Sequence, residues 1–198
     1  MKIKICGLFR PADIDFVNEA LPDFVGFVFA ESRRQITPET AREFKKRLAP
    51  QIAAVGVFVN AETDEILRLF EEKIIDIAQL HGNEDAQYIK NLKKLSDLLI
   101  IKAVSVGCEK SDFPGFPGFP KNADYFLFDN GTGGTGQAFD WEKIPAVNKP
   151  YFLAGGIGLH NIKDAVELRP YCIDLSGGAE TGGVKDREKI IQLVRAVR

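Results

Sequence analysis

The sequence has few cysteines, no excess of charge of one sign and no apolar run long enough to cross a membrane. Its three cysteines, Cys6, Cys108 and Cys172, are an odd number without Cys-x-x-Cys spacing, so they indicate neither a disulfide framework nor a zinc site. The 28 acidic and 26 basic residues give a formal net charge of -2, without the basic field that nucleic-acid binding usually requires. The longest apolar runs, 52–59 and 98–106, have the length of strands. We therefore expect no nucleic-acid partner, no membrane partner and no bound metal.

Length and composition predict one compact domain over residues 1–198. A chain of 198 residues that is 45% hydrophobic can bury a substantial core without dividing in two. Its first residues enter a strand pattern directly, with no signal-peptide core or cleavage site, so we expect a cytoplasmic protein. Nothing in the sequence distinguishes a monomer from a homodimer.

Short apolar runs rich in Val, Ile and Phe alternate with amphipathic, charged segments, which is typical of parallel βα units. The expected strands are 2–6, 24–29, 52–59, 76–80, 98–106, 125–129, 151–154 and 172–175. The expected helices are 12–20, 38–48, 62–72, 84–95, 161–168 and 186–197. Thr37 before a first-turn proline is a typical helix start, and Asn60 is the expected cap of the helix over 62–72.

Two units depart from this alternation. The stretch Phe113–Pro120 repeats Phe, Pro and Gly, and each proline removes a backbone donor while each glycine adds backbone freedom. We expect a loop there in place of the fifth helix. Residues 130–136 are rich in glycine, so any helix in the sixth unit should be short and begin near Trp141.

The position of the glycine-rich turns separates a closed barrel from an open doubly wound sheet. An open dinucleotide-binding sheet would carry Gly-x-Gly-x-x-Gly after its first strand, where this chain has Cys-Gly-Leu-Phe-Arg at 6–10. The glycine-rich turns here, 155–158 and 176–178, follow the seventh and eighth strands, where many (β/α)8 barrels bind phosphate. Either turn alone is equally well explained as a tight strand-to-helix connection. Together they favour a single (β/α)8 barrel, or TIM barrel, that binds a phosphorylated small molecule.

Polar residues at the ends of the expected strands are the candidates for chemistry, because a barrel gathers these ends at one face. Cys6 ends the first strand and Asp129 the sixth, while Arg34 and His81 follow the second and fourth. Each also has an ordinary explanation: a buried apolar thiol, a helix cap, a solvated arginine or a structural histidine. Position alone therefore assigns no role to any of them.

Eight motifs in order resemble those of phosphoribosylanthranilate isomerases, and they span essentially the whole chain. They are Lys-Ile-Cys-Gly-Leu at 4–8, Val-Gly-Phe-Val-Phe at 25–29 with Ser-Arg-Arg at 32–34, Val-Gly-Val-Phe-Val-Asn at 55–60, Gln-Leu-His-Gly at 79–82, Ile-Lys-Ala-Val at 101–104, Asp129 with Gly-Gly-Thr-Gly at 133–136 and Phe-Asp-Trp at 139–141, Leu-Ala-Gly-Gly-Ile at 153–157, and Ile-Asp-Leu-Ser at 173–176. The chain departs from the family at Gly177, where a second serine is usual before the glycine of the last phosphate loop. The Phe-Pro-Gly repeat is a second departure.

The resemblance implies an Amadori rearrangement of N-(5-phosphoribosyl)anthranilate to 1-(2-carboxyphenylamino)-1-deoxy-ribulose 5-phosphate in tryptophan biosynthesis, with no cofactor. It implies that Asp129 is the general acid and Cys6 the general base. By the same resemblance, the planar guanidinium of Arg34 binds the anthranilate carboxylate. The remaining substrate-binding residues that it implies are His81, Gly155, Gly156, Ser176, Gly177 and Gly178.

Three other functions fit a phosphate-binding barrel. A related isomerase of histidine biosynthesis performs the same rearrangement, but similar enzymes carry an aspartate where this chain has Cys6. Indole-glycerol-phosphate synthase would have catalytic Lys and Glu at strand ends and a longer amino-terminal extension, and we identify neither feature in this sequence. A non-catalytic barrel that only binds a phosphorylated ligand is the last alternative, against which Cys6 and Asp129 argue.

Overall fold

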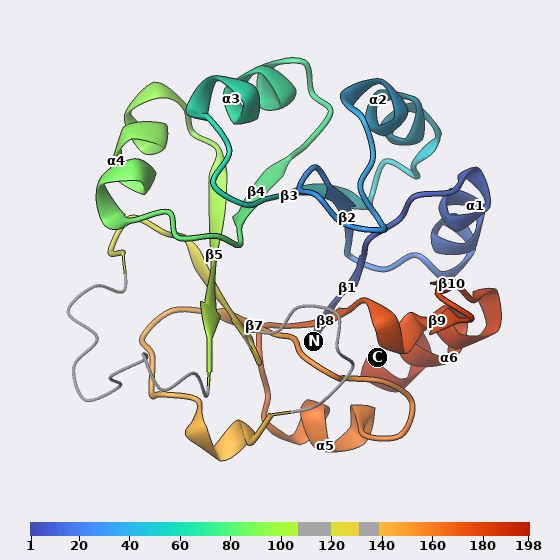
Figure 1. Ribbon diagram of the computed structural model, residues 1–198. Helices are drawn as coiled ribbons and strands as arrows, with labels where there is room; N and C mark the ends of the chain where they lie inside the picture. The colour runs from blue at the N-terminus through green and yellow to red at the C-terminus, as the bar shows by residue number, and fades with distance from the viewer. Residues whose placement is uncertain (107–119, 131–138) are drawn as a thin grey trace.

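The computed structural model describes residues 1–106, 120–130 and 139–198. Eight parallel strands pair in sequence order, and β1 also pairs with β8, so that the sheet closes into a barrel (Figure 1). The strands are β1 (Lys2–Cys6), β2 (Phe24–Val28), β3 (Ala53–Phe58), β4 (Ile77–Leu80), β5 (Leu99–Ser105), β6 (Tyr125–Asp129), β7 (Tyr151–Leu153) and β8 (Cys172–Leu175). The predicted barrel is confirmed, and every strand lies within one residue of its expected bounds.

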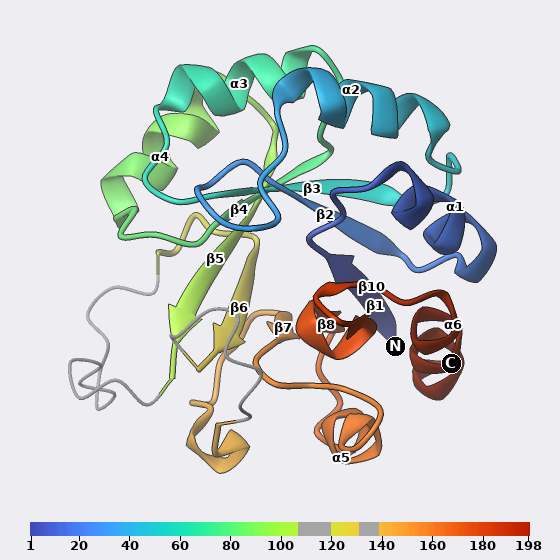
Figure 2. The same ribbon diagram turned by 45° about the vertical axis from the view of Figure 1, so that its right-hand side comes forward.

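The helices lie outside the barrel, and α1 to α4 form an arc along one side of it in both views (Figures 1 and 2). They are α1 (Pro11–Ala20), α2 (Pro38–Arg47), α3 (Thr63–Glu71), α4 (Ala86–Leu95), α5 (Ile162–Glu167) and α6 (Arg187–Val197). The expected short helix near Trp141 is the 3-10 helix η1 (Trp141–Lys143). No helix within the described ranges combines the length and apolar character needed to span a membrane. The loop expected at Phe113–Pro120 falls outside the described residues except for Pro120.

The two predicted helix caps have different outcomes. Thr37 caps α2, because its Oγ1 accepts a hydrogen bond from the Thr40 N–H at 3.2 Å. The prediction for Asn60 is wrong, since α3 begins at Thr63, three residues later. Asn60 instead has a positive φ of 52°, and its side-chain oxygen accepts a hydrogen bond from the Asn83 N–H at 2.8 Å. It therefore joins the loops that follow β3 and β4.

A small hairpin after β8 was not predicted. The 3-10 helix η2 (Gly177–Ala179) leads into β9 (Glu180–Thr181), which pairs antiparallel with β10 (Val184–Lys185). The turn between them is Gly182-Gly183, with φ of 59° and 84°. Strands of two residues are too short to show an alternation of apolar and polar side chains, so sequence periodicity could not reveal this hairpin.

An apolar layer supports the carboxyl-terminal end of the barrel from below. Its buried members come from alternate strand positions and are Phe24, Val55, Ile77, Ile101, Leu127, Phe152, Ala154 and Cys172. The Phe152 ring lies 5.6 Å from the rings of both Phe24 and Tyr125, measured between centroids. Side chains two residues further along a strand point to the same side. This layer is therefore the apolar floor beneath the inward-pointing side chains at the carboxyl-terminal strand ends.

We expect Phe152→Ala to lower the free energy of unfolding by about 3–5 kcal/mol, because it removes a fully buried ring and leaves a cavity in this layer. Urea denaturation followed by circular dichroism measures the loss. Leu168→Ala is the matched control, since Leu168 is 39% exposed and its truncation should cost less than about 0.5 kcal/mol. Equal losses in the two variants would contradict the assignment of Phe152 to a close-packed floor.

Candidate active site

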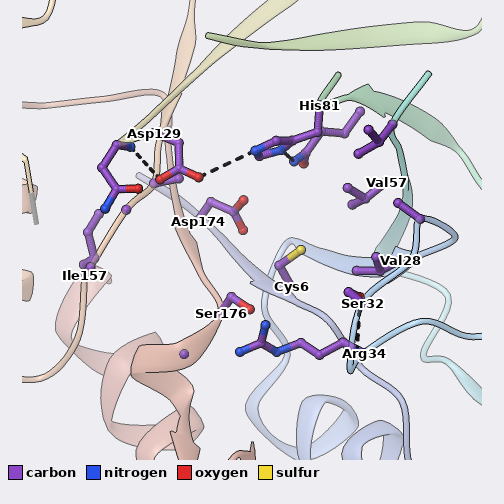
Figure 3. A pocket seen from close by; sticks show the side chains of 18 of the residues that line it. Cys6, Val28, Ser32, Arg34, Val57, His81, Asp129, Ile157, Asp174 and Ser176 are labelled. Atoms are coloured by element: carbon purple, nitrogen blue, oxygen red, sulfur yellow. Dashed lines mark hydrogen bonds and ion pairs between the residues drawn. The ribbon is translucent and has the colours of Figure 1, made fainter. Parts of the chain in front are cut away.

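A cavity of about 270 Å³ opens at the carboxyl-terminal ends of the strands, and Figure 3 shows the side chains that line it. Ala154 belongs both to this lining and to the apolar layer, so the two adjoin. A closed parallel barrel brings these ends together from distant parts of the chain. Every residue that the sequence singled out lines this cavity: Cys6, Arg34, His81, Asp129, Gly155, Gly156, Ser176, Gly177 and Gly178. The side chains and loops expected to act together are therefore found in one site.

Cys6 is the last residue of β1 and is only 9% exposed. Burial raises the pKa of its thiol. The nearby charge of Lys4 opposes this effect but does not cancel it, and the charge of Asp174 adds to the increase. Gly26 on the neighbouring strand makes room for the thiol, because a β-carbon there would lie 2.5 Å from the Cys6 sulfur. At neutral pH burial therefore keeps Cys6 mainly as the neutral thiol.

Asp129 ends β6 and is 8% exposed. Its Oδ1 accepts a hydrogen bond from the Asn130 N–H at 2.7 Å, and its Oδ2 lies 3.6 Å from Nε2 of His81. In Figure 3 Asp129 and Cys6 stand on different parts of the cavity wall, both facing the space between them. The acid and base candidates thus border one cavity from the ends of two different strands, β1 and β6.

A buried chain of polar side chains runs beside both candidates. Lys4 is fully buried and donates to Oε1 of Gln79 and Oδ2 of Asp174, each at 2.9 Å. Because the oxygen of Gln79 accepts from Lys4, its amide nitrogen faces Nδ1 of His81 at 2.9 Å and donates to it. A neutral His81 then carries its proton on Nε2, the nitrogen that faces Asp129.

Arg34 is 9% exposed, so its ordinary explanation as a solvated surface residue is wrong. Its Nε and Nη2 atoms donate to the two carboxylate oxygens of Glu180 at 2.6 and 2.9 Å. Its stem packs on Gly7, which has a φ of 78°, and a β-carbon on Gly7 would lie 2.4 Å from Cδ of Arg34. The guanidinium is therefore fixed at the cavity by β9 and by the turn after β1.

The two glycine-rich loops pack against each other. A β-carbon at Gly178 would lie 1.9 Å from the Ile157 carbonyl oxygen, so no side chain fits there. Gly155 and Gly156 have φ of 84° and 66°, values that favour glycine. The part of this unit that lines the cavity is the loop 154–157, and α5 begins five residues later at Ile162.

Within the described parts of the chain, no group of three or more His, Cys, Asp or Glu side chains is arranged to hold a metal ion. The groups that line the cavity include the thiol of Cys6, the carboxyls of Asp129 and Asp174, the imidazole of His81 and the guanidinium of Arg34. Such a set supports proton transfer together with binding of an anion.

The comparisons with known proteins identify the family. The family model for N-(5'-phosphoribosyl)anthranilate isomerase matches residues 3–196. The N-(5'-phosphoribosyl)anthranilate isomerase of Endomicrobium trichonymphae is 46% identical, over 100% of this chain and 98% of that protein. The chain belongs to the N-(5'-phosphoribosyl)anthranilate isomerase family. It is therefore an isomerase that acts on a phosphorylated small molecule in tryptophan biosynthesis, and not one of the other barrel functions considered above.

Solved structures agree with this assignment. A phosphoribosylanthranilate isomerase from Thermus thermophilus superimposes with a TM-score of 0.86 and 34% identity, covering 100% of this chain and 98% of that one. Another, with a TM-score of 0.81 and 30% identity over the same shares, is in complex with reduced 1-(o-carboxyphenylamino)-1-deoxyribulose 5-phosphate. The fold and the reaction are thus those of the family.

Four buried residues of this site were not identified from the sequence: Lys4, Gln79, Asp174 and Glu180. Three of them carried a usable signal, because a charged or amide side chain inside an apolar strand must find a polar partner when the strand is buried on both faces. Lys4 also lies two residues before Cys6 and so shares its face of β1. Glu180 lies outside the eight barrel strands and had no such signal.

We expect alkylation of Cys6 by iodoacetamide to be slow at pH 7 and to accelerate with a midpoint above the value of about 8.5 for a free thiol. The reason is that a raised pKa leaves less thiolate at any given pH below it. Mass spectrometry of a Cys108→Ser variant measures the rate, and Cys172, which is fully buried, is the internal control that should react only after unfolding. A midpoint below that of a free thiol would contradict this description of the site.

Proposed function

We propose that Cys6 is the general base and Asp129 the general acid of the Amadori rearrangement. The observation that carries this proposal is that the two side chains end β1 and β6, both nine-tenths buried, on the wall of one cavity. The reaction requires an acid that protonates the ribose ring oxygen bonded to C1 and a base that takes the proton from C2, and a carboxyl and a thiol can serve as these two groups. The family resemblance assigns the same roles to the same residues.

In the first step, Asp129 protonates the ring oxygen of the ribose while the bond from that oxygen to C1 breaks. The lone pair of the anthranilate nitrogen forms a double bond to C1, which gives a positively charged Schiff base. In the second step, Cys6 takes the proton from C2, and the electrons of that C–H bond form the C1–C2 double bond as the nitrogen recovers its lone pair. The enol becomes the ketone when C1 gains a proton and the hydroxyl on C2 loses one, so that this last step leaves the number of protons on the substrate unchanged.

The bound intermediate itself favours the form of Cys6 that can act as a base. Burial raises the pKa of Cys6, so little of the thiolate, the form that acts as a base, is present at neutral pH before the substrate reacts. The cationic Schiff base forms only after Asp129 has acted, and its charge makes C2 more acidic and favours a thiolate nearby. The order of the two proton transfers thus follows from the electrostatics of the site.

The remaining parts of the cavity bind the two anionic groups of the substrate. Arg34 binds the anthranilate carboxylate, and His81 supports Asp129 through Nε2. The loops that contain Gly155 and Gly156, and Ser176 to Gly178, bind the phosphate. Support for the phosphate site comes from the close packing of these loops and from the positive φ of Gly155 and Gly156, which lets the backbone approach an anion.

We expect Cys6→Ala and Asp129→Asn each to lower kcat by roughly 10²–10⁴ with a much smaller effect on KM, because each removes a group that acts in the transition state. Fluorescence of the anthranilate derivative follows turnover. Cys172→Ala and Asp124→Asn are the matched controls. Cys172 lies in the apolar floor, and Asp124 lies at the opposite end of β6 from Asp129. Near wild-type turnover in a folded Cys6 or Asp129 variant would remove that residue from its role.

A second prediction compares two substitutions in the phosphate loops. Gly156→Val should weaken competitive inhibition by inorganic phosphate about tenfold, because a β-branched residue at a φ of 66° costs roughly 1–3 kcal/mol in the binding conformation. Gly177→Ser should be tolerated or should strengthen inhibition, since the nearest atom to its β-carbon is 4.0 Å away, on Arg34. Gly178 is unsuitable for this test because any side chain there meets the Ile157 carbonyl. Equal inhibition constants for the two variants would argue against phosphate binding at these loops.

A further inference from the structure

Glu180 of the small hairpin pairs with three cations, of which Arg34 and Lys185 are buried and Arg33 is exposed. Its carboxylate accepts hydrogen bonds from Arg34, from Lys185 at 2.6 Å and from Arg33 at 2.6 Å, and Glu180 itself is only 7% exposed. Burial alone raises the pKa of this carboxyl, but the hydrogen bonds from Arg34 and Lys185 outweigh burial and lower it. Glu180 therefore carries its negative charge throughout the neutral range.

The backbone and side chain of Glu180 are both held in place. Lys189 of α6 donates to the Glu180 carbonyl at 2.7 Å, and Lys185 also donates to the Ser176 carbonyl at 3.1 Å. The pairing of β9 with β10 fixes Glu180 opposite Lys185. The position of this carboxylate is thus determined by the hairpin, by α6 and by the loop after β8.

The way in which Glu180 binds Arg34 leaves a second donor pair available. An arginine guanidinium has five N–H donors in a fixed plane. Glu180 takes the lateral pair, one on Nε and one on Nη2. The terminal pair, on Nη1 and Nη2, is parallel and has the spacing of a carboxylate, and Arg34 lines the cavity while Glu180 does not. Figure 3 shows the guanidinium of Arg34 directed toward Ser176 across the cavity.

We propose that Glu180 is a positioning residue that holds Arg34 with its terminal donor pair directed at the carboxylate of the bound anthranilate. The inference rests on the proposed role of Arg34. Because the long arginine side chain is locked between Gly7 and Glu180, it loses no further freedom when it binds the ligand. Glu180 thereby sets the preference of the site for an aromatic ring that carries a carboxylate.

The test compares two ligands that differ in one group. Reduced 1-(o-carboxyphenylamino)-1-deoxyribulose 5-phosphate has the carboxylate, and the same compound made from aniline lacks it. Binding of both is measured by calorimetry on the wild type, Glu180→Gln, Arg34→Ala and the double variant. The ratio of the two dissociation constants reports the contribution of the carboxylate alone, whatever happens to phosphate binding or to overall stability.

We expect the wild type to prefer the carboxylated ligand by about tenfold or more, as a charge-assisted hydrogen-bonded pair implies. Arg34→Ala should abolish this preference. Glu180→Gln should remove most of it while changing affinity for the aniline compound by less than about twofold, and the double variant should lose no more than Arg34→Ala. In turnover assays KM should rise in Glu180→Gln with little change in kcat, because the carboxylate is bound before and during the reaction.

Glu84→Gln is the matched control, because Glu84 is also a buried carboxylate that pairs with a lysine, Lys102, at 2.9 Å. Because Glu84 pairs with Lys102 and Arg34 pairs with Glu180, replacing Glu84 can weaken both ligands alike but should leave the ratio of their two dissociation constants unchanged. If Glu180→Gln fails to fold, Glu180→Asp keeps the charge beside Lys185 while shortening the reach to Arg34, and should show a reduced preference.

The outcomes separate the two proposals. A full preference in Arg34→Ala would overturn the role of Arg34 and this inference with it. A loss of preference in Arg34→Ala together with a wild-type preference in the folded Glu180 variants would overturn the inference alone. Equal weakening of both ligands in Glu180→Gln would show a general structural role for Glu180 and would also overturn it.

Discussion

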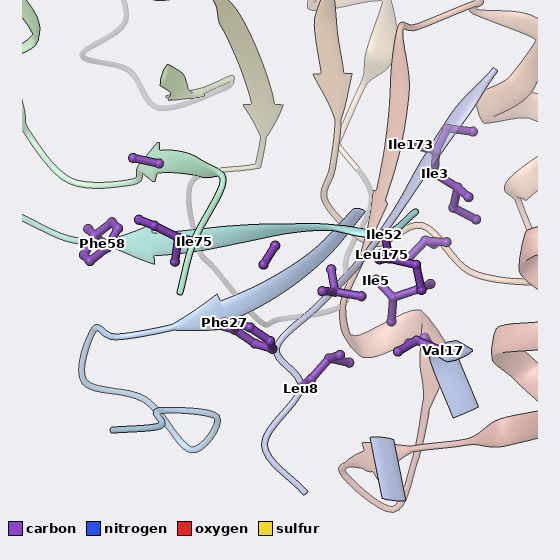
Figure 4. Packing of buried hydrophobic residues seen from close by; sticks show 14 of the residues in the cluster. Ile3, Ile5, Leu8, Val17, Phe27, Ile52, Phe58, Ile75, Ile173 and Leu175 are labelled. Carbon is purple, nitrogen blue, oxygen red and sulfur yellow. The ribbon is translucent and has the colours of Figure 1, made fainter. Parts of the chain in front are cut away.

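Closure of the barrel between β1 and β8 is the constraint on which the rest of the site depends. These strands pair from Lys2 opposite Cys172 to Ile5 opposite Leu175, across nearly the whole chain. On the outer side of the same seam, Ile3, Ile5, Ile173 and Leu175 pack together with Val17 of α1 (Figure 4). Without this pairing Cys6 would have no fixed relation to the loop after β8.

Buried ion pairs then fix the individual pieces of the site. Lys4 and Asp174 join β1 to β8 inside the barrel. Lys102 and Glu84 hold the loop after β4, because Lys102 also donates to the Gly82 carbonyl at 2.7 Å, next to His81. Buried ion pairs seldom add net stability over apolar side chains, but the loss of one partner is costly, so they favour one arrangement over others. In this barrel the favoured arrangement is the one that holds β1, β8 and the loop after β4 in place around the cavity.

The two groups proposed to transfer protons, a thiol and a carboxyl, are weak catalysts on their own. A thiol whose pKa is raised by burial and a carboxyl at a strand end are modest catalysts in isolation. Preorganisation around the substrate is the usual source of rate in such sites, because dipoles and charges that are already oriented need not reorganise during the reaction. The close packing of the glycine loops and the double anchoring of Arg34 are consistent with that principle.

How much of this protein could be predicted from its sequence follows from the range of the interactions involved. Alternation and apolar runs determined the eight strands, each within one residue, and the ordered motifs determined the family, since both are written in consecutive residues. Tertiary structure alone decided that Asn60 joins two loops rather than capping α3, that no side chain fits at Gly178, and that Arg34 is buried on Glu180. Arg34 and Glu180 are 146 positions apart, and Lys4 and Asp174 are 170 apart, so no local pattern records their contact. Only closure of the barrel brings these charged residues together. Their long-range pairing fixes the side chains at the strand ends in positions where they can act as one site.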